Sequence, residues 1–385
     1  MWRHIASNAL TFLVVMAFLL GGVILWGQNT YRAEGPLGEQ ICLRVNPGSN
    51  MRTVSEKLEA ELAVRSAAIF RVGAAYSKKS GKLKAGSWLI PEGASMSEIT
   101  DIVTRGGAST CGVEVVYRIG VTRSEVQVRE LDPATSRFVE KVAFNPAEDS
   151  APAEFTEVRS QSDTRYRVAI AEGVTSWQIV DALGRVDVLK GEIADTPPEG
   201  SLSPDSYEVR EGDDRAELIQ AMTTAQEVLV AAAWAGRDPD LPLKSAGELL
   251  ILASIIEKET GVAAERGQVS SVFVNRLNLG MRLQTDPTVI YGITKGQGVL
   301  GRGLRQSELR KETPWNTYVI DGLPVTPIAN PGRASIEAAA NPDTTNFVFF
   351  VADGTGGHAF AKTLAEHNIN VAKWREIEAE RATNQ

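Results

Sequence analysis

The pattern of apolar and polar positions begins with one long hydrophobic run. Residues 8–27, NALTFLVVMAFLLGGVILWG, contain no charged side chain and match the ~20 residues that a helix needs to span a bilayer. Arg3 precedes the run, and Trp26 and Tyr31 stand where interfacial aromatic residues anchor a span. A cleaved signal peptide is the alternative, but the long apolar core and the lack of an Ala-x-Ala site argue against it. We expect a cytoplasmic tail at 1–7, a single-pass inner-membrane anchor and a periplasmic remainder.

A repeat follows the anchor. In each copy a short strand leads into a glycine, and apolar residues stand six and ten positions later, four apart and therefore on one helix face. The glycines are Gly48, Gly93, Gly173 and Gly212. The copies predict four strand-turn-helix units, with helices at about 51–60, 96–105, 176–184 and 214–223. Paired two by two, they predict small βα modules at 40–110 and 166–225.

The segment between the two modules, residues 111–165, has a different pattern. VEVVYRI (113–119) and EVQVREL (125–131) alternate as exposed strands. NPAEDSAPAEF (145–155) is rich in proline and acid and predicts a loop. We interpret this segment as a β-rich insertion to which the sequence assigns no task.

The stretch from Leu249 to Gly292 carries the strongest chemical signal. Its first part predicts a helix over 248–260 that is apolar up to Ile256, so Glu257 and Glu259 fall at a largely buried helix end. Burial raises the pKa of a glutamate and keeps it protonated near neutral pH, as a general acid requires. Periodicity alone does not choose between the two glutamates. The alternative is a helix end whose glutamates are solvated or paired with nearby basic residues, namely Lys258, Arg266 or Arg276.

Polar and aromatic side chains are dense after this helix. A second amphipathic helix is predicted at Val269–Leu279, and MRLQTDPTVIYG (281–292) contains an Asp-Pro pair that signals a turn. Three later segments add amides, hydroxyls and rings: PWNTY (314–318), GLPVTPIANPG (322–332) and FVFFVADGTGGHAFAKTLAEHN (347–368). Sugars offer hydroxyl groups to amides and flat C–H faces to aromatic rings. The composition of these segments therefore predicts a carbohydrate cleft.

Together these segments resemble the YceG-like family of endolytic murein transglycosylases. The resemblance rests on ASIIEKE, VFVNRL, MRLQTDPTVIYG, WNTY, GLPVTPIANPG and the GGHAF…EHN ending, which occur in that order. It implies a membrane-tethered enzyme that cleaves nascent peptidoglycan strands, and its catalytic acid is the first glutamate of S-I-[VI]-E-K-E, here Glu257. The fold class it implies is α+β, with LysM-like βα modules followed by a YceG-like catalytic domain at 226–380. The family commonly has GLP-PGPI where this chain has GLPVTPI, so we expect a different loop around Val325 and Thr326.

Under this interpretation Glu257 protonates the glycosidic oxygen between N-acetylmuramic acid and N-acetylglucosamine. The resulting carboxylate then accepts the proton of the muramyl C6 hydroxyl as it attacks C1, which leaves a 1,6-anhydromuramyl end. A hydrolase would need a second carboxylate ~5 to 9.5 Å away, for which Asp286 is the candidate, and a non-catalytic wall-binding scaffold is a third hypothesis. The candidate substrate-binding residues are Asn275, Gln284, Asp286, Tyr291, Asn316, Tyr318, Asn330 and His358.

Composition and charge limit the partners. A net charge of −8 argues against nucleic acid. The apolar run predicts contact with the inner membrane, and the resemblance implies peptidoglycan strands and peptidoglycan synthases such as penicillin-binding proteins as partners. We expect no metal and no cofactor, because the histidines, His4, His358 and His367, match no usual zinc spacing.

The two cysteines bracket the first module. Cys42 lies at the start of its first predicted strand and Cys111 just past its end. A disulfide between them would close the module and contribute roughly 4 kcal/mol by the chain-entropy treatment. Two separate buried thiols are the alternative.

Overall fold

The computed structural model describes residues 2–107, 109–161 and 163–383, with side chains from residue 10 to residue 381 within these ranges. The chain divides into two compact units. The first contains the residues up to Val116, Gln127–Phe144 and Ser150–Tyr166, and the second contains Tyr117–Val126, Asn145–Asp149 and the residues from Arg167 onward.

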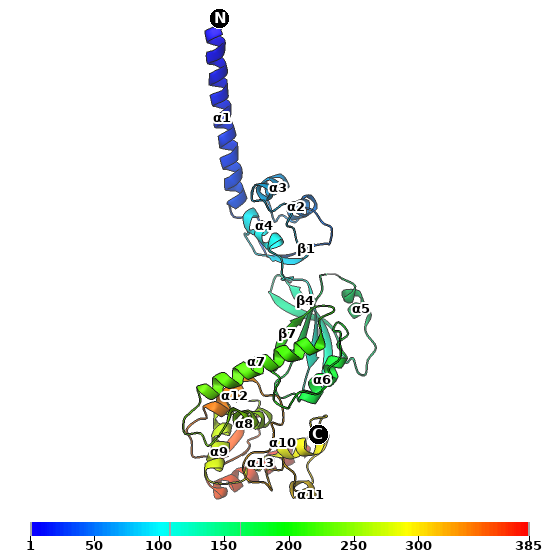
Figure 1. The fold of residues 1–385 in the computed structure, drawn as a ribbon, viewed down its shortest axis with the longest axis vertical. Helices are drawn as coiled ribbons and strands as arrows, with labels where there is room; N and C mark the ends of the chain where they lie inside the picture. Colours follow the sequence, from blue (N-terminus) through cyan, green and yellow to red (C-terminus); the bar gives the residue numbers. More distant parts are fainter. Residues whose placement is uncertain (1, 108, 162, 384–385) are drawn as a thin grey trace. The chain divides into compact units, whose positions relative to one another are not determined.

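The first unit opens with α1 (Trp2–Arg32), a single long helix drawn in blue in Figure 1. Its part from Leu10 to Arg32 is long and apolar enough to cross a membrane, and the most apolar 18-residue window within it has a mean hydropathy of 2.4. Its large apolar side chains from Leu10 to Trp26 are exposed. Length and composition therefore fit the predicted anchor, although a signal sequence meets the same criteria.

The first βα module folds as the repeat predicts. β1 (Ile41–Val45) pairs antiparallel with β2 (Gly86–Ile90), and α2 (Met51–Ala60) and α4 (Met96–Arg105) have the predicted bounds. Asn50 caps α2, and Ser95 with Glu98 forms a capping box on α4, which satisfies the free N–H groups of the first turn. The repeat did not predict α3 (Ala67–Tyr76), because its apolar residues are not confined to one face.

The two cysteines form a disulfide. Cys42 of β1 and Cys111 are bonded, with 5.8 Å between their Cα atoms and 69 residues between them in sequence. The alternative of two separate thiols is therefore wrong, and the covalent link closes the chain around the whole module.

The segment after the module forms strands of a five-stranded sheet. Its order is β5-β4-β3-β6-β7, and its strands are β3 (Val113–Ile119), β4 (Ser124–Asp132), β5 (Arg137–Phe144), β6 (Arg165–Ile170) and β7 (Ser206–Val209). The prediction that 113–119 is an exposed strand is wrong, since β3 is the central strand and is mostly buried. The predicted loop at 145–155 ends early, because α5 (Ala153–Arg159) begins directly after Pro152.

The second unit is largely helical. α6 (Ser176–Gly184) follows β6 as predicted, and α7 (Arg215–Ala235) extends beyond the fourth repeat helix. The remaining elements are α8 (Ala246–Glu259), η1 (Ala263–Glu265), α9 (Arg266–Asn278), α10 (Asp286–Thr294), α11 (Gln306–Leu309), α12 (Arg333–Ala340), β8 (Phe349–Ala352), β9 (His358–Ala361) and α13 (Leu364–Thr383). The fold is thus mixed α+β, as expected.

The core of the second unit is built around α8. Leu249, Leu252, Ala253, Ile255 and Ile256 are fully buried, and α8 packs against α7, α9, α10 and α12. The predicted turn at Asp286-Pro287 is wrong, since this pair begins α10. Proline is well tolerated there because the first helical N–H has no intrahelical acceptor.

Truncating the core of this unit should be costly. Phe273 of α9 is 1% exposed and packs edge to face on Phe350 of β8, with 5.8 Å between ring centroids. We expect Phe273→Ala to lower the free energy of unfolding by about 3–5 kcal/mol. The exposed Leu279 provides the control, because Leu279→Ala should change that free energy by less than about 0.5 kcal/mol. Chemical denaturation of both variants measures the difference, and equal effects would contradict the burial of Phe273.

Candidate functional site

The last turn of α8 presents three charged side chains in succession, Glu257, Lys258 and Glu259. Successive residues of a helix are about 100° apart, so the two glutamates point in nearly opposite directions. Each therefore enters a different environment, although they are separated by a single residue. Two distinct groups of side chains form around them.

Glu259 lies among polar groups in a mostly buried setting. Thr285 Oγ1 donates a hydrogen bond to Glu259 Oε1, and Thr285 is itself buried. Burial raises the pKa of Glu259, and the negative charge of Asp286 raises it further, while the Thr285 hydrogen bond and the positive charges of His358 and Arg276 act in the opposite direction. The residue as a whole keeps intermediate solvent exposure.

The solvent-facing side of this group comes from two chain segments. Tyr318 donates its phenolic hydrogen to Asp286 Oδ1 at 2.6 Å, and burial together with Asp286 raises the pKa of Tyr318. Asp286 is exposed, and so is Gln284, whose backbone N–H bonds Thr317 O at 3.1 Å while its φ is +49°. Three of the predicted substrate-binding residues thus lie on the Glu259 side.

His358 completes this group from the start of β9. Its Nδ1 lies 2.8 Å from Glu265 Oε2, and its backbone N–H donates to Glu265 Oε1 at 3.0 Å. Both side chains are largely buried. The carboxylate of Glu265 therefore fixes the orientation of the His358 imidazole, which acts electrostatically on Glu259.

Glu257 faces the start of α12 instead. Its Oε2 accepts the backbone N–H of Gly332 at 3.0 Å, and Gly332 is the N-cap residue of α12, whose own side chain can offer no cap. A Cβ at Gly332 would lie 1.7 Å from Glu172 Oε1, so a larger residue there would displace the Glu172 side chain. Burial, followed by the charge of Glu257, raises the pKa of Glu172. This arrangement suits a carboxylate that anchors α12.

Tyr291 and Asn330 belong to a third, buried polar group centred on Glu199. Ser176 N donates to Glu199 Oε1 at 2.8 Å, and Asn330 Nδ2 bonds Val174 O at 2.9 Å while its Oδ1 accepts Leu202 N at 2.9 Å. Burial raises the pKa of Glu199, and the Tyr291 hydroxyl is hydrogen-bonded to it. Asn330 is fully buried, so its contacts stabilise the segment 198–202, which precedes β7.

The other two predicted amides also bind backbone. Asn316 Nδ2 donates to the carbonyls of Glu308, Leu309 and Lys311 at 2.7–3.1 Å, and Asn316 is 1% exposed. Asn275 Nδ2 donates to Thr345 O and Phe347 O, both at 2.9 Å. In this structure their amide hydrogens are engaged in holding loops and not directed at a ligand.

The loop in which the chain departs from the common family form packs against an aromatic residue. Thr326 Oγ1 accepts a hydrogen bond from Trp315 Nε1 at 2.9 Å, while Val325 is exposed. The Trp315 ring lies 5.8 Å from that of Tyr291 and below Lys295 Nζ, at 3.4 Å. The threonine thus supplies a hydroxyl acceptor that orients this tryptophan.

Sequence reasoning missed two residues of the Glu259 group. Glu265 fixes His358 across 93 residues of sequence, and Thr285 bonds Glu259. A search for hydroxyl residues near an acid would have selected Thr285, whereas no local sequence pattern marked Glu265. Arg276, named above as a possible partner of the glutamates, donates to Val348 O and Leu283 O from a buried position, and its positive charge lowers the pKa of Glu259.

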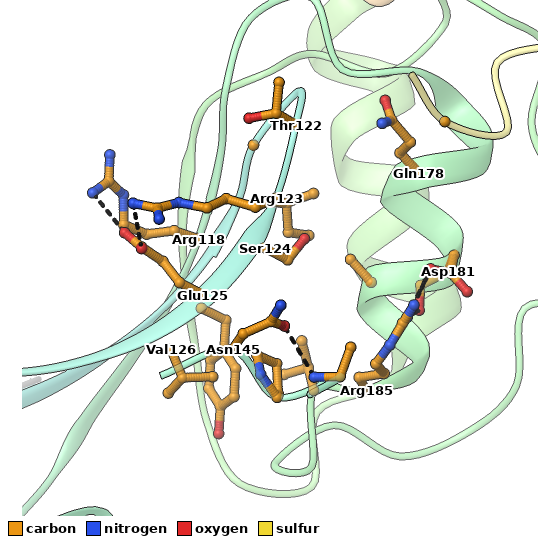
Figure 2. Close-up of a pocket in the computed structure, with 18 of the residues that line it drawn as sticks. Arg118, Thr122, Arg123, Ser124, Glu125, Val126, Asn145, Gln178, Asp181 and Arg185 are labelled. Atoms are coloured by element: carbon orange, nitrogen blue, oxygen red, sulfur yellow. Dashed lines mark hydrogen bonds and ion pairs between the residues drawn. The ribbon is translucent and has the colours of Figure 1, made fainter. Parts of the chain in front are cut away.

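A pocket lies elsewhere in the second unit, between the β3–β4 turn and α6 (Figure 2). Its charged residues are already paired, Arg118 and Arg123 with Glu125 and Arg185 with Asp181. None of the residues that line it is among the predicted site residues. We assign it no ligand.

Comparisons with known proteins agree with the motifs. A model of the YceG-like family matches residues 143–373. A protein named endolytic murein transglycosylase from Bacillus subtilis (strain 168) is 27% identical over 352 residues, covering 91% of this chain and 89% of the relative. A protein of the same name from Streptococcus pneumoniae serotype 2 (strain D39 / NCTC 7466) is 26% identical, covering 96% of this chain and 65% of the relative.

A crystal structure of a YceG-like protein from Listeria monocytogenes is also similar. It has 26% sequence identity and a TM-score of 0.47, and the alignment covers 86% of this chain and 99% of that one. The family match spans more than half of the chain and includes α8 and every predicted site residue. This protein therefore belongs to the YceG-like family.

Proposed function

We propose that this protein is an endolytic murein transglycosylase that cleaves nascent peptidoglycan strands and so ends their elongation. Membership of the YceG-like family and the names of its relatives support the assignment. The observation that carries it is the Glu259 group, in which a partly buried carboxyl with a raised pKa lies beside exposed polar residues. A neutral carboxylic acid next to groups that can bind hydroxyls is the minimum that protonation of a glycosidic oxygen needs.

In this proposal Glu259, and not Glu257, is the proton donor. It protonates the oxygen between N-acetylmuramic acid and N-acetylglucosamine while the C1–O bond breaks. Its carboxylate then removes the proton of the muramyl C6 hydroxyl as that oxygen bonds to C1, so the acid is regenerated and no water is consumed. The positive charge of Arg276, which lowers the pKa of Glu259, stabilises the carboxylate during this interval. Glu257, which bonds the start of α12, is the alternative donor.

The exposed residues of the group have separate roles in the proposal. Asp286, held by Tyr318, and Gln284 bind sugar hydroxyls. Asp286 is also the second carboxylate that a hydrolase would use, and in this structure its charge acts on Glu259. The hydrolase and the non-catalytic scaffold are the alternatives against which the proposal is tested. Mass spectrometry of sacculi digested with the full-length protein in detergent separates the three: anhydro ends support the transglycosylase, reducing ends the hydrolase, and no cleavage the scaffold.

Two substitutions should move the pH profile in opposite directions. A general acid works only when protonated, so kcat/KM should fall as pH rises through the raised pKa of Glu259. The Thr285 hydrogen bond lowers this pKa and Asp286 raises it. We therefore expect the falling limb to lie at higher pH in Thr285→Val and at lower pH in Asp286→Asn than in the unmodified protein. A limb that neither change moves would exclude Glu259 as the titrating acid.

The same pKa gives the sign of a stability effect. A carboxyl whose pKa is raised by folding contributes stability that is fully present below its unfolded pKa and is lost as pH rises through the folded pKa. Burial of Glu259 therefore disfavours the folded state at alkaline pH relative to acidic pH. In this proposal, the lower stability at alkaline pH is the consequence of keeping Glu259 neutral for cleavage.

The proposal also includes the location and the modules. α1 anchors the chain in the inner membrane with its N-terminus in the cytoplasm, and the remainder lies in the periplasm with its glycan substrate and peptidoglycan synthases. The βα modules are proposed to be LysM-like and to contact glycan, and a plain spacer is the alternative. Titration of the full-length protein with chitooligosaccharides, followed by NMR of labelled methyl groups in α2 and α4, would detect contact with the first module.

A further inference from the structure

The first unit contains an exposed apolar surface on α3. This helix, AAIFRVGAAY, buries Ala67, Phe70 and Ala74 in the module core, but its opposite side is apolar as well. Val72 is 70% exposed and Tyr76 is 77% exposed, and they are four residues apart on one face. Ala68 and Ala75 are exposed on the same side. Apart from Arg71, α3 is apolar on every side, and such a helix is normally covered, yet no part of the chain that the structure describes covers Val72 and Tyr76.

The position of α3 relative to α1 identifies the partner of this face. α3 and α4 both pack against α1, and Figure 1 shows α3 beside the C-terminal end of α1. A Cβ at Gly73 would lie 2.2 Å from the Tyr31 ring, so the glycine lets the two helices approach. The Tyr31 hydroxyl donates to Thr100 Oγ1 of α4 at 2.8 Å. The end of α1 and the module are thus one packed assembly.

Helix geometry places this contact close to the bilayer. The apolar part of α1 ends at Trp26, and Tyr31 is five residues further along, which is about 7.5 Å at 1.5 Å per residue. The polar headgroup regions add roughly 5–8 Å on each side of the hydrocarbon core. Because a helix with its side chains is about 10 Å wide, α3 at the level of Tyr31 reaches the headgroups.

Charge supports the same partner. Residues 65–84 contain six basic side chains and no acidic one, in a chain of net charge −8. They are Arg65, Arg71, Lys78, Lys79, Lys82 and Lys84. Lys79 pairs with Asp101, and Lys78, Lys82 and Lys84 are exposed directly after α3. An apolar helix face next to a basic segment is typical of helices that lie in a membrane interface.

We propose that α3 and the basic segment 78–84 form a second membrane contact, with Val72 and Tyr76 in the headgroup layer and the lysines on anionic phospholipid headgroups. This contact fixes the tilt of the first module on the membrane. The proposal depends on α1 being a membrane anchor and does not depend on the catalytic assignment.

Site-specific labelling of the full-length protein in nanodiscs tests the contact. Both native cysteines are in the disulfide, so Val72→Cys or Tyr76→Cys adds one reactive thiol for an environment-sensitive fluorophore. Val139→Cys is the matched control, because Val139 is an exposed valine of β5 in the same unit. We expect shallow doxyl lipid to quench labels at 72 and 76 at least about threefold more than the label at 139. Aqueous iodide should show the reverse order.

A label at Leu19→Cys tests the membrane anchor separately from the membrane contact of α3. Deep doxyl quenching at 19 without quenching at 72 and 76 would overturn the membrane contact of α3 and leave the anchor intact. Lack of quenching at 19 would overturn both. Labels at 72 and 76 that are shielded from iodide but not quenched by lipid would show a protein partner, such as a second copy, and would also overturn the proposal. Nanodiscs without anionic lipid, or Lys78→Glu with Lys82→Glu, should weaken quenching at 76, and an unchanged signal would contradict the role of the lysines.

Discussion

Glu259→Gln should reduce the rate of peptidoglycan cleavage by about 10²–10⁴-fold, the range that a positioned general acid contributes. Glutamine has nearly the same shape, and its amide oxygen can still accept the Thr285 hydrogen bond. The substitution therefore removes the transferable proton while the surrounding contacts persist. The measurement is the yield of anhydromuropeptides from purified sacculi by liquid chromatography and mass spectrometry.

Glu257→Gln is the matched control, because Glu257 lies two residues earlier on the opposite face of α8. Its amide oxygen can still accept the Gly332 N–H that the carboxylate binds, so α12 should keep its position. We expect this variant to retain at least about a tenth of the activity, since the proposal gives Glu257 no proton to transfer. The opposite result, with Glu257→Gln inactive and Glu259→Gln active, would return the catalytic assignment to the first glutamate of the motif. Circular dichroism of both variants would verify that the fold is intact.

Removing the disulfide should be the largest single change in the stability of the first module. The bond between Cys42 and Cys111 closes a loop of 69 residues, and the chain-entropy treatment gives such a loop roughly 4 kcal/mol. Replacing both cysteines by serine should therefore lower the free energy of unfolding of the module by about that amount. Hydrogen–deuterium exchange of peptides from β1 and β2 measures the effect locally, which separates it from the unfolding of the second unit.

The unmodified protein provides two controls for this prediction. Thiol titration under denaturing, non-reducing conditions should find no free thiol, and reduction should release two. Peptides from the second unit, including those of α8, should exchange at the same rate before and after reduction. Exchange in β1 and β2 that reduction leaves unchanged would mean that noncovalent packing alone holds the module together.

Local sequence patterns predicted those helices whose start and buried face are determined by a few neighbouring residues. The repeat gave α2, α4 and α6 with their observed bounds, because a glycine turn followed by a four-residue apolar spacing constrains both the start and the buried face of a helix. The apolar run gave α1. By contrast, the burial of β3 depended on strands that pair on both sides of it, and α3 has apolar residues on every side, so periodicity offered no signal.

What the sequence by itself determined is the family, the mixed α+β class, and the pair of glutamates at the end of one apolar helix. Only the tertiary structure decided that Cys42 and Cys111 are bonded. It also decided that the side-chain amides of Asn275, Asn316 and Asn330 donate hydrogen bonds to backbone carbonyls, and which groups surround each glutamate. The physical reason is that a pKa and a binding role depend on neighbours within a few ångströms. For Glu259 these neighbours come from positions 276, 285, 286 and 358, which no local pattern in the chain connects.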